Sequence, residues 1–370
     1  MTPSLPTSPR PPRLASVDAV RGIAVAAMIL VNSPGDWGHV WWPLEHAEWH
    51  GCTPTDLIFP LFLFIVGVSL AMATGPLLDT GSARTASLRP WLARAARLVV
   101  LGLVLHLVAH LALGTAHFRP MGVLQRIGLC FGVAAVCLLR WPLTSPARWL
   151  APLLAVLAVW GTLLLTGGTL APLHNLAARV DVAVLGPLVW QYDTAAGLGH
   201  EPEGLLSTLG ALGTCWLGVM AGELLRRGHA SGAATRQLAV MTAVLLITGA
   251  LTQSLWPWNK ALWTPSFVLW TGGWATGVLL VAHRRIDLHG APAVGRAFGI
   301  NAITAYAGSW LLTCLLDGTG WGPAAYAHLA AALPGHWPLE LPSHAWALAQ
   351  VLVWWLVVRF MQRRGWIISV

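Results

Sequence analysis

The chain has 370 residues, of which 56% are hydrophobic and only 10% are charged, whereas soluble domains carry about 25% charged residues. The mean hydropathy of +0.65 excludes a water-soluble globular protein, a disordered chain and a fibrous repeat. The net charge of +8 would suggest a nucleic-acid partner in a soluble protein, but in membrane proteins Lys and Arg gather in cytoplasmic loops. The predicted fold class is therefore an all-α polytopic membrane helix bundle without a nucleic-acid partner.

The first ten residues, MTPSLPTSPR, are polar and rich in Pro and Ser. They lack the apolar centre of a cleavable signal peptide, so the first apolar run should remain as a membrane helix. We expect residues 1–12 to be a disordered cytoplasmic tail and residues 13–370 to form a single transmembrane domain. The five cysteines show no CxxC or metal-type spacing, and a disulfide framework is not expected.

A helix needs about 20 mostly apolar residues to span a bilayer, and such stretches predict about ten helices. They are placed near 16–34, 54–74, 93–113, 121–139, 148–166, 205–225, 237–255, 264–283, 297–316 and 344–362. With both termini in the cytoplasm, 18 of the 22 basic residues lie inside and four remain outside, namely Arg119, Arg126, Arg179 and Lys260. Ten of the 14 acidic residues fall on or near the outer side. This bias indicates either a pocket for a cationic or polyhydroxy substrate or a solvated face.

The first predicted helix carries Asp18 and Arg21 at its inner end, three residues apart and therefore on one face. Either the two residues form a simple interfacial ion pair, or Arg21 is held at this position to bind an anionic ligand. Asn32 ends the same helix, 11 residues and about 16 Å of rise further on.

His46 lies in the following outer loop and Asp56 at the start of the second helix, so both should border the same outer vestibule as Asn32. A neutral imidazole is a usable general base near pH 7. A carboxylate would orient it, and an Asn amide would polarise a carbonyl oxygen. The chain holds 14 histidines, so His46 is also a candidate bystander.

Further along the chain, His106 and His110 have metal-type spacing but no third ligand, so no metal is expected. Gln125 and Arg126 begin the fourth helix as either pocket-lining residues or structural anchors. The long outer segments 35–53, 167–204 and 317–343 are rich in Trp, which fits interfacial belts or sugar-stacking platforms.

Seven blocks of the sequence resemble, in order, the heparan-α-glucosaminide N-acetyltransferase family and its bacterial relatives. They are RLASVDAVRGIAVAAMILVNSPG, LEHAEWHGCTPTDLIFPLFLFIVGVSL, PMGVLQRIGLCF, NLAARVDVAVLG, HEPEGLLSTLGALGTCWLGVMAGELL, WPWNKALWTPSFVL and GINAITAYAGSW. They span nearly all of residues 13–316. The resemblance implies a multi-pass acyltransferase that takes acetyl from cytosolic acetyl-CoA and passes it to the amine of a terminal glucosamine across the membrane.

By motif position, the resemblance places the family's active-site His at His46 and its Asn at Asn32, with Asp56 beside them. It places the basic residues that hold the CoA nucleotide at Arg13 and Arg21, in the motif that includes Asp18. The family's HAPWNG-like run reads HAEWHG here, and the additional His50 would compete for the base role or bind sugar. The residues expected to bind the acceptor are His50, Trp49, Gln125, Arg126, Glu203, Asn259 and Lys260.

The expected partners are acetyl-CoA as co-substrate, an amino-sugar acceptor, the lipid bilayer and, optionally, a second copy in a homodimer. The expected location is a bacterial inner membrane, where heparan is not an expected substrate. Two alternatives stay open from the sequence: a transporter of an amino sugar or envelope precursor, and an O-acetyltransferase of an envelope glycan. Direct transfer and an enzyme-bound acetyl intermediate are equally compatible with these residues.

Overall fold

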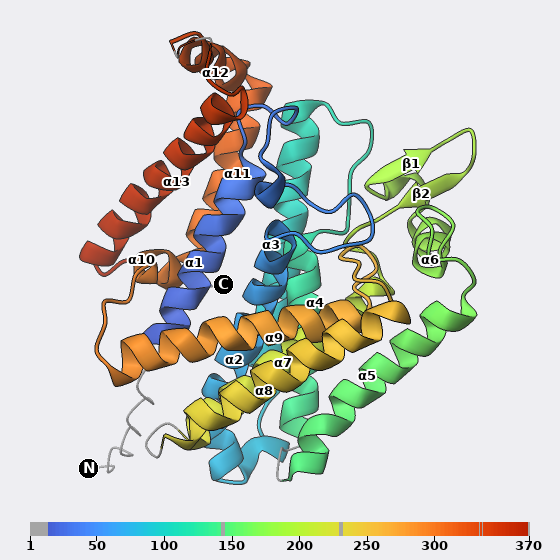
Figure 1. Cartoon of the computed structure of the whole chain (residues 1–370), viewed down its shortest axis with the longest axis vertical. Coiled ribbons are helices and arrows are strands. Elements are labelled where there is room, and N and C mark those ends of the chain that lie inside the picture. Colours follow the sequence, from blue (N-terminus) through green and yellow to red (C-terminus); the bar gives the residue numbers. More distant parts are fainter. Residues whose placement is uncertain (1–13, 142–144, 229–231, 333, 335, 369–370) are drawn as a thin grey trace, which may run out of the picture.

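The computed structural model in Figure 1 describes residues 14–141, 145–228, 232–332, 334 and 336–368. The α-helices are α1 (Ala15–Asn32), α2 (Ile58–Asp79), α3 (Arg89–Leu113), α4 (Val123–Arg140), α5 (Pro146–Thr166), α6 (Leu176–Leu185), α7 (Ser207–Gly228), α8 (Ala233–Leu251), α9 (Pro265–Ala282), α10 (Arg296–Ile300), α11 (Ala302–Gly318), α12 (Trp321–Ala332) and α13 (Glu340–Arg363). Short 3₁₀ turns occupy Trp42–Leu44, Thr55–Leu57, Ser82–Arg84, Gly186–Leu188 and Thr252–Ser254, and a π-helical turn, His283–Leu288, follows α9. The strands β1 (Gln191–Asp193) and β2 (Leu198–His200) form an antiparallel pair.

The predicted all-α membrane bundle is confirmed. Within the described residues, nine helices are long and apolar enough to cross a bilayer. The ninth predicted span, 297–316, is instead divided at Asn301 into α10 and α11, and α11 has only 17 residues. The Asn301 side chain donates to the carbonyl of Trp366 and accepts from the amide of Ile368, both at 3.2 Å. The break is therefore tied to the end of the chain.

Helices α2 and α7 form the centre of the bundle, where glycines allow their backbones to touch. A Cβ added to Gly67 would lie 1.9 Å from the carbonyl oxygen of Cys215, and one added to Gly218 would lie 1.9 Å from that of Phe64. Small residues at helix interfaces allow this close approach within membranes, where dispersion rather than the hydrophobic effect drives helix packing. The buried side chains of Phe64 and Leu63 fill the space beside this contact.

The remaining helices surround this pair. Figure 1 shows α8 and α9 lying side by side across the bundle, α5 beyond α7, and α1, α11 and α13 grouped on the opposite flank. Helices α3, α5, α8 and α13 expose many Leu and Val side chains, which is the composition that lipid contact requires.

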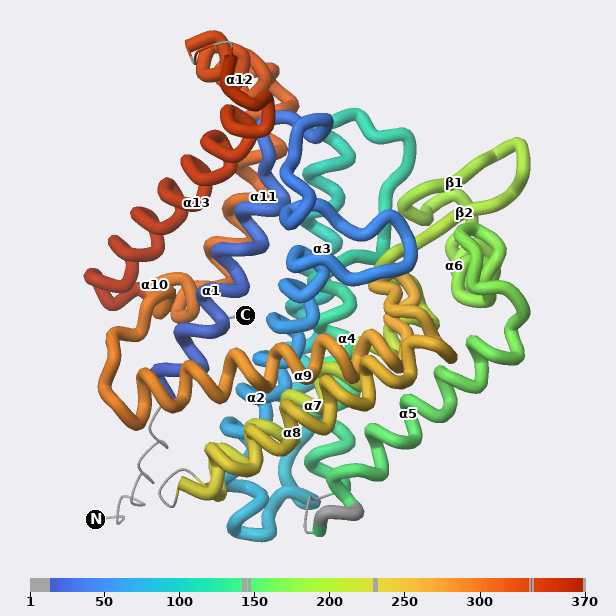
Figure 2. Tube along the Cα trace, viewed as in Figure 1, coloured from blue at the N-terminus to red at the C-terminus, as the bar shows by residue number. Residues whose placement is uncertain are grey.

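Most irregular segments gather at one end of the bundle, which we call the loop end. It carries the α1–α2 loop (33–57), the hairpin β1–β2 with α6, the α8–α9 segment (252–264), and α12 (Figure 1). Figure 2 shows the α1–α2 loop passing close to the segment that precedes α9. The opposite end carries the start of α1 and the α2–α3 connection. Sequence reasoning predicted the long segments 167–204 and 317–343 but not the hairpin and α12 within them. The predicted disordered tail at 1–12 lies outside the described residues, and the cytoplasmic placement of both termini stays a prediction.

Candidate active site

His46 and Asp56 form a hydrogen-bonded pair at the loop end. The Nδ1 of His46 lies 2.7 Å from Oδ1 of Asp56, which lies at the end of the α1–α2 loop, in the 3₁₀ turn directly before α2. The other carboxylate oxygen accepts from the amides of Ala47 (3.1 Å) and Thr53 (3.0 Å) and from the Thr53 hydroxyl (3.1 Å). Asp56 is therefore a fixed acceptor: its side chain is 1% exposed, while that of His46 is 48% exposed.

This pairing determines where His46 can accept a proton. An ionised carboxylate only accepts hydrogen bonds, so Nδ1 of His46 carries the hydrogen and Nε2 carries the free lone pair. The same arrangement orients the histidine base in hydrolases that use a Ser-His-Asp triad. The predicted juxtaposition of His46 and Asp56 is thus present in the structure.

Lys260 completes this cluster from the α8–α9 segment. Its Nζ lies 3.0 Å from both ring nitrogens of His46 and 3.8 Å from Oδ1 of Asp56. Burial lowers the pKa of Lys260 below its ordinary value, although the negative charges of Asp56 and Glu203 act to raise it. Because Nδ1 of His46 already donates to Asp56, Nε2 is the ring nitrogen that can accept a hydrogen bond from the ammonium.

Asn259 holds the α1–α2 loop against the α8–α9 segment. It is fully buried, and its amide donates to the carbonyl of Trp49 at 2.9 Å while its oxygen accepts from the amide of Leu262 at 2.8 Å. The backbone amide of Gly51 also donates a hydrogen bond of 2.7 Å to the carbonyl of Trp258, which joins the same two segments. These bonds use both ends of the Asn259 amide and favour an anchoring role.

Two aromatic residues predicted to bind the acceptor, Trp49 and His50, lie on the α1–α2 loop. The indole of Trp49 donates to the carbonyl of Leu170 at 2.9 Å and meets the ring of His200 edge-on at 5.3 Å. His50 is exposed, and its Nδ1 lies 3.4 Å from the Asn259 amide nitrogen.

A network of buried charges lies next to this cluster. Arg119 contacts both Glu201 and Glu203. Burial alone would lower the pKa of Arg119, but the charge of Glu203 and the hydrogen bond to Glu201 raise it above its ordinary value. The pKa of Glu203 is lowered because the charges of Arg119, Arg126 and Lys260 outweigh its burial. Glu203 therefore stays ionised, and its field reaches Lys260.

Arg126 and Gln125 are deeply buried at the start of α4. Arg126 donates to the carbonyls of Pro202 (3.0 Å) and Gly204 (3.3 Å) and to the hydroxyl of Ser207 (2.5 Å). Its Nε and Nη1, together with Oε1 of Gln125, have no hydrogen-bond partner among the residues that the structure describes. Buried polar atoms are rarely left without partners, so these three atoms have hydrogen-bonding capacity that the described residues do not use.

Asn32 lies at the last position of α1, and its side chain is exposed at the loop end. In the described part of the chain its amide makes no hydrogen bond, which leaves it available to a ligand. No group of three or more metal-ligating side chains occurs within the described residues. His106 instead contacts the carbonyl of Arg119 at 2.7 Å.

At the opposite end of the bundle, Arg21 and Asp18 form the ion pair that their spacing predicts, at 2.5 Å. Arg21 also donates to the carbonyl of Gly299 at 2.7 Å, and Arg296 lies 4.0 Å from the second oxygen of Asp18. Arg21 is thus partly neutralised and braced by α10. Arg13 lies outside the described residues.

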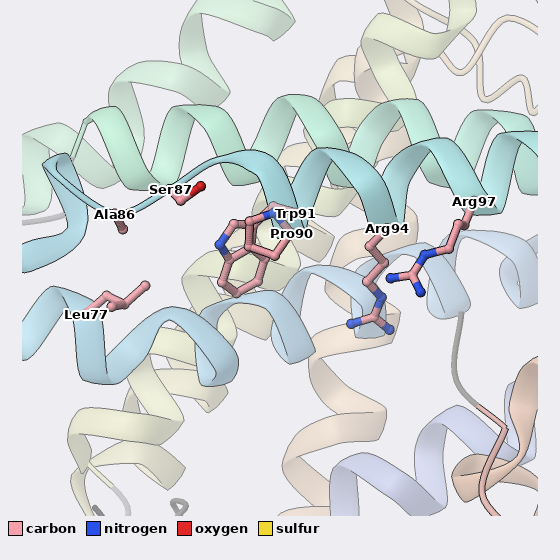
Figure 3. A pocket seen from close by; sticks show the side chains of 7 residues that line it. All are labelled: Leu77, Ala86, Ser87, Pro90, Trp91, Arg94 and Arg97. Carbon is pink, nitrogen blue, oxygen red and sulfur yellow. The ribbon is translucent and has the colours of Figure 1, made fainter. Parts of the chain in front are cut away.

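The same end carries a groove of about 550 Å³, which sequence reasoning missed. Its lining residues are Leu77, Ala86, Ser87, Pro90, Trp91, Arg94 and Arg97. Figure 3 shows Trp91, Arg94 and Arg97 in a row along one face of α3. Two arginines one helical turn apart at the start of an apolar helix were the available signal. An indole with two guanidinium groups can bind an aromatic base carrying phosphates.

Comparison with known proteins assigns the chain to a family. The family model for the heparan-α-glucosaminide N-acetyltransferase catalytic region matches residues 13–259. The chain is 30% identical to human heparan-α-glucosaminide N-acetyltransferase over 355 residues, covering 80% of this chain and 53% of the human protein. It is 29% identical to the mouse protein over 357 residues, covering 81% and 54%. It thus spans about half the length of the curated relatives it matches. The matched region contains both His46 and Asp56, and the chain belongs to the heparan-α-glucosaminide N-acetyltransferase catalytic family.

Proposed function

We propose that this protein is a membrane-embedded acetyltransferase. It takes acetyl from acetyl-CoA at the arginine-lined end of the bundle and transfers it to the amine of a glucosamine-type acceptor at the loop end. The observation that carries the proposal is the His46–Asp56 pair, a base with a buried orienting carboxylate inside the region matched by the family model. The arginine-lined end faces the cytosol in this proposal, which follows from the bias of basic residues.

In the proposed reaction, Nε2 of His46 removes the proton from the attacking amine. The amine nitrogen bonds to the acetyl carbon, the carbon–sulfur bond breaks, and the His46 imidazolium gives its proton to the departing thiolate, so that CoA leaves as the thiol. Asp56 stabilises the imidazolium that forms, since it is 2.7 Å from Nδ1 and shielded from water. Asn32 donates a hydrogen bond to the developing oxyanion from the end of α1.

The donor site in this proposal uses the groove on α3. Arg94 and Arg97 bind the CoA phosphates, and Trp91 stacks on the adenine. Arg21 is partly neutralised by Asp18, so it contributes less charge than its position in the sequence predicts. Arg13 stays a predicted contributor.

For the acceptor site, the ionised Glu203 suits a sugar that carries an amine, whereas the unpartnered atoms of Gln125 and Arg126 are closed off from solvent, which favours a structural role for both residues. His50 and Trp49 border the same loop, and an indole face suits the apolar face of a sugar ring. The acidic bias of the loop end also suits an amine-bearing acceptor.

The test is transfer of labelled acetyl from acetyl-CoA to glucosamine by the purified protein in nanodiscs. We expect His46→Ala, which removes the base, to lower the rate of acetyl transfer by about 100-fold or more. His39→Ala is the matched control: His39 lies on the same loop and pairs with Asp36 at 2.8 Å, and its loss should leave transfer unchanged. Full activity in His46→Ala would refute the mechanism. A product labile to mild base would identify an ester and therefore an O-acetyltransferase. Uptake of glucosamine into sealed vesicles without acetyl-CoA would identify a transporter.

A further inference from the structure

The chain contains 22 basic residues, and Lys260 is the only lysine among them. Each of the other 21 lysine or arginine positions is an arginine, which cannot lose its proton in a protein. A lysine can become a neutral amine and act as a nucleophile when it is buried. The single residue with this capacity lies against the proposed general base.

The position of Lys260 relative to His46 is that of a nucleophile relative to its base. Nζ lies 3.0 Å from both Nδ1 and Nε2 of His46, so the amine is within the distance that proton transfer requires once the ring turns the lone pair of Nε2 toward it. Nδ1 of His46 is held by Asp56, so Nε2 is the atom that receives a proton. In the proposed reaction the acceptor amine must take this same place beside Nε2, and in its absence the Lys260 amine occupies it.

The charges around Lys260 keep its amine at this position. Asp56 lies 3.8 Å from Nζ, and the ionised Glu203 acts on it from the buried network. Burial lowers the pKa of Lys260, which increases the fraction of neutral amine near pH 7. Its side chain is 23% exposed, so the amine is reachable from the vestibule that would receive the acetyl thioester.

We propose that Lys260 is a self-acetylation site, a proposal that rests on acetyl-CoA being the donor. When no acceptor is bound, the Nζ lone pair attacks the thioester carbonyl and an N–C bond forms as the C–S bond breaks. Nε2 of His46 takes the proton from the nitrogen and passes it to the departing thiolate, so that CoA leaves as the thiol. The product is an amide, which is not turned over, so the modified enzyme has lost its ammonium beside Asp56 and carries an acetyl group at the acceptor position. Acetyl-CoA without acceptor therefore inactivates the enzyme slowly, and an acceptor amine protects it.

The experiment uses the purified full chain in nanodiscs, incubated with labelled acetyl-CoA and followed by peptide mass spectrometry. We expect one added acetyl group on the peptide containing Lys260, formed at least about tenfold more slowly in His46→Ala and at the wild-type rate in the matched control His39→Ala. Added glucosamine should suppress the modification. Peptide mapping separates Lys260 from the other amino group of the chain, the N-terminal amine.

Lys260→Arg retains the positive charge and provides the functional readout. Preincubation with acetyl-CoA should reduce later acetyl transfer by the wild type but leave whatever activity Lys260→Arg has unchanged. Transfer to glucosamine with Lys260 unmodified would overturn this inference while leaving the proposed function intact. Equal modification in His46→Ala or in denatured protein would overturn it as well, because the reaction would then be uncatalysed. Modification of Lys260 without transfer to glucosamine would support self-acetylation and refute the proposed acceptor.

Discussion

Replacing Asp56 by Asn keeps the shape of the side chain but removes the property on which the proposed base depends. The Asp56 carboxylate accepts four hydrogen bonds and is 1% exposed. The Asn oxygen can still accept from the amides of Ala47 and Thr53, so the loop should keep its conformation. The amide group then faces Nδ1 of His46 and donates to it. This moves the ring hydrogen to Nε2, and the lone pair that should receive the substrate proton is lost.

The magnitude has two contributions. A hydrogen bond to a charged group is worth about 1.5–3 kcal/mol, which corresponds to about 10- to 150-fold in rate when it is lost from the transition state. The wrong tautomer adds to this, and in a serine protease the equivalent Asp-to-Asn change lowers kcat by about 10⁴. We therefore expect kcat for acetyl transfer to fall by about 10²–10⁴ in Asp56→Asn, with the KM for acetyl-CoA within about twofold of wild type.

The assay is steady-state transfer of labelled acetyl to glucosamine, with the melting temperature measured in parallel. Asp36→Asn is the control, because Asp36 forms the other His–Asp pair of the same loop and lies outside the proposed site. An Asp56→Asn enzyme that retains kcat within threefold of wild type would refute the tautomer argument. A large fall in melting temperature would show instead that Asp56 acts through the loop.

Three further predictions concern other parts of the molecule. Arg97→Ala should raise the KM for acetyl-CoA by about 10- to 100-fold, because a charge-assisted contact with a phosphate is lost. The KM for acetyl-pantetheine, which lacks the nucleotide, should stay constant. An equal change for both donors would contradict the proposed role of the groove. Burial raises the pKa of Asp181 from 3.8 to about 6, so the folded state holds the additional proton between these values, and wild-type stability falls across this window as pH rises. Asp181→Asn should therefore gain up to about 3 kcal/mol relative to wild type between pH 4 and pH 7, and a pH-independent difference in melting temperature would exclude this cause. Gly67→Ala should destabilise the bundle by about 1–3 kcal/mol because the new Cβ would lie 1.9 Å from the Cys215 carbonyl, whereas Gly277→Ala, whose Cβ would meet its nearest atom at 3.3 Å, should melt near the wild-type temperature.

The spans were predictable because a bilayer imposes a length and an apolar composition that are visible in the sequence. The exception is the span at 297–316. Its composition is apolar throughout, and the break at Asn301 depends on hydrogen bonds to residues more than 60 positions away. A window of hydropathy contains no information on such a partner.

The site was predictable where its residues are close in sequence and not where they are distant. His46 and Asp56 are ten positions apart and bracket one loop, so their pairing followed from helix placement. Lys260 was expected at the acceptor site, but its contact with His46 joins residues 214 positions apart. Asn259 and Arg126 illustrate a further ambiguity: a polar residue beside an apolar run serves a ligand or a backbone carbonyl, and only the direction of its side chain distinguishes the two.

The bonds of Asn259 and Gly51 across the loop end have a consequence for the order in which the protein becomes competent during its synthesis. The helices through α7 can enter the membrane with the His46–Asp56 pair already made, since both residues lie near the start of the chain. The loop that carries His46 contacts its anchor, Asn259, and the ammonium of Lys260 only after the α8–α9 segment has been synthesised and inserted. A nascent chain that stops short of this segment would thus present an imidazole without the cation that occupies its lone pair. Completion of the second half of the chain is the step that assembles the chemistry of the first.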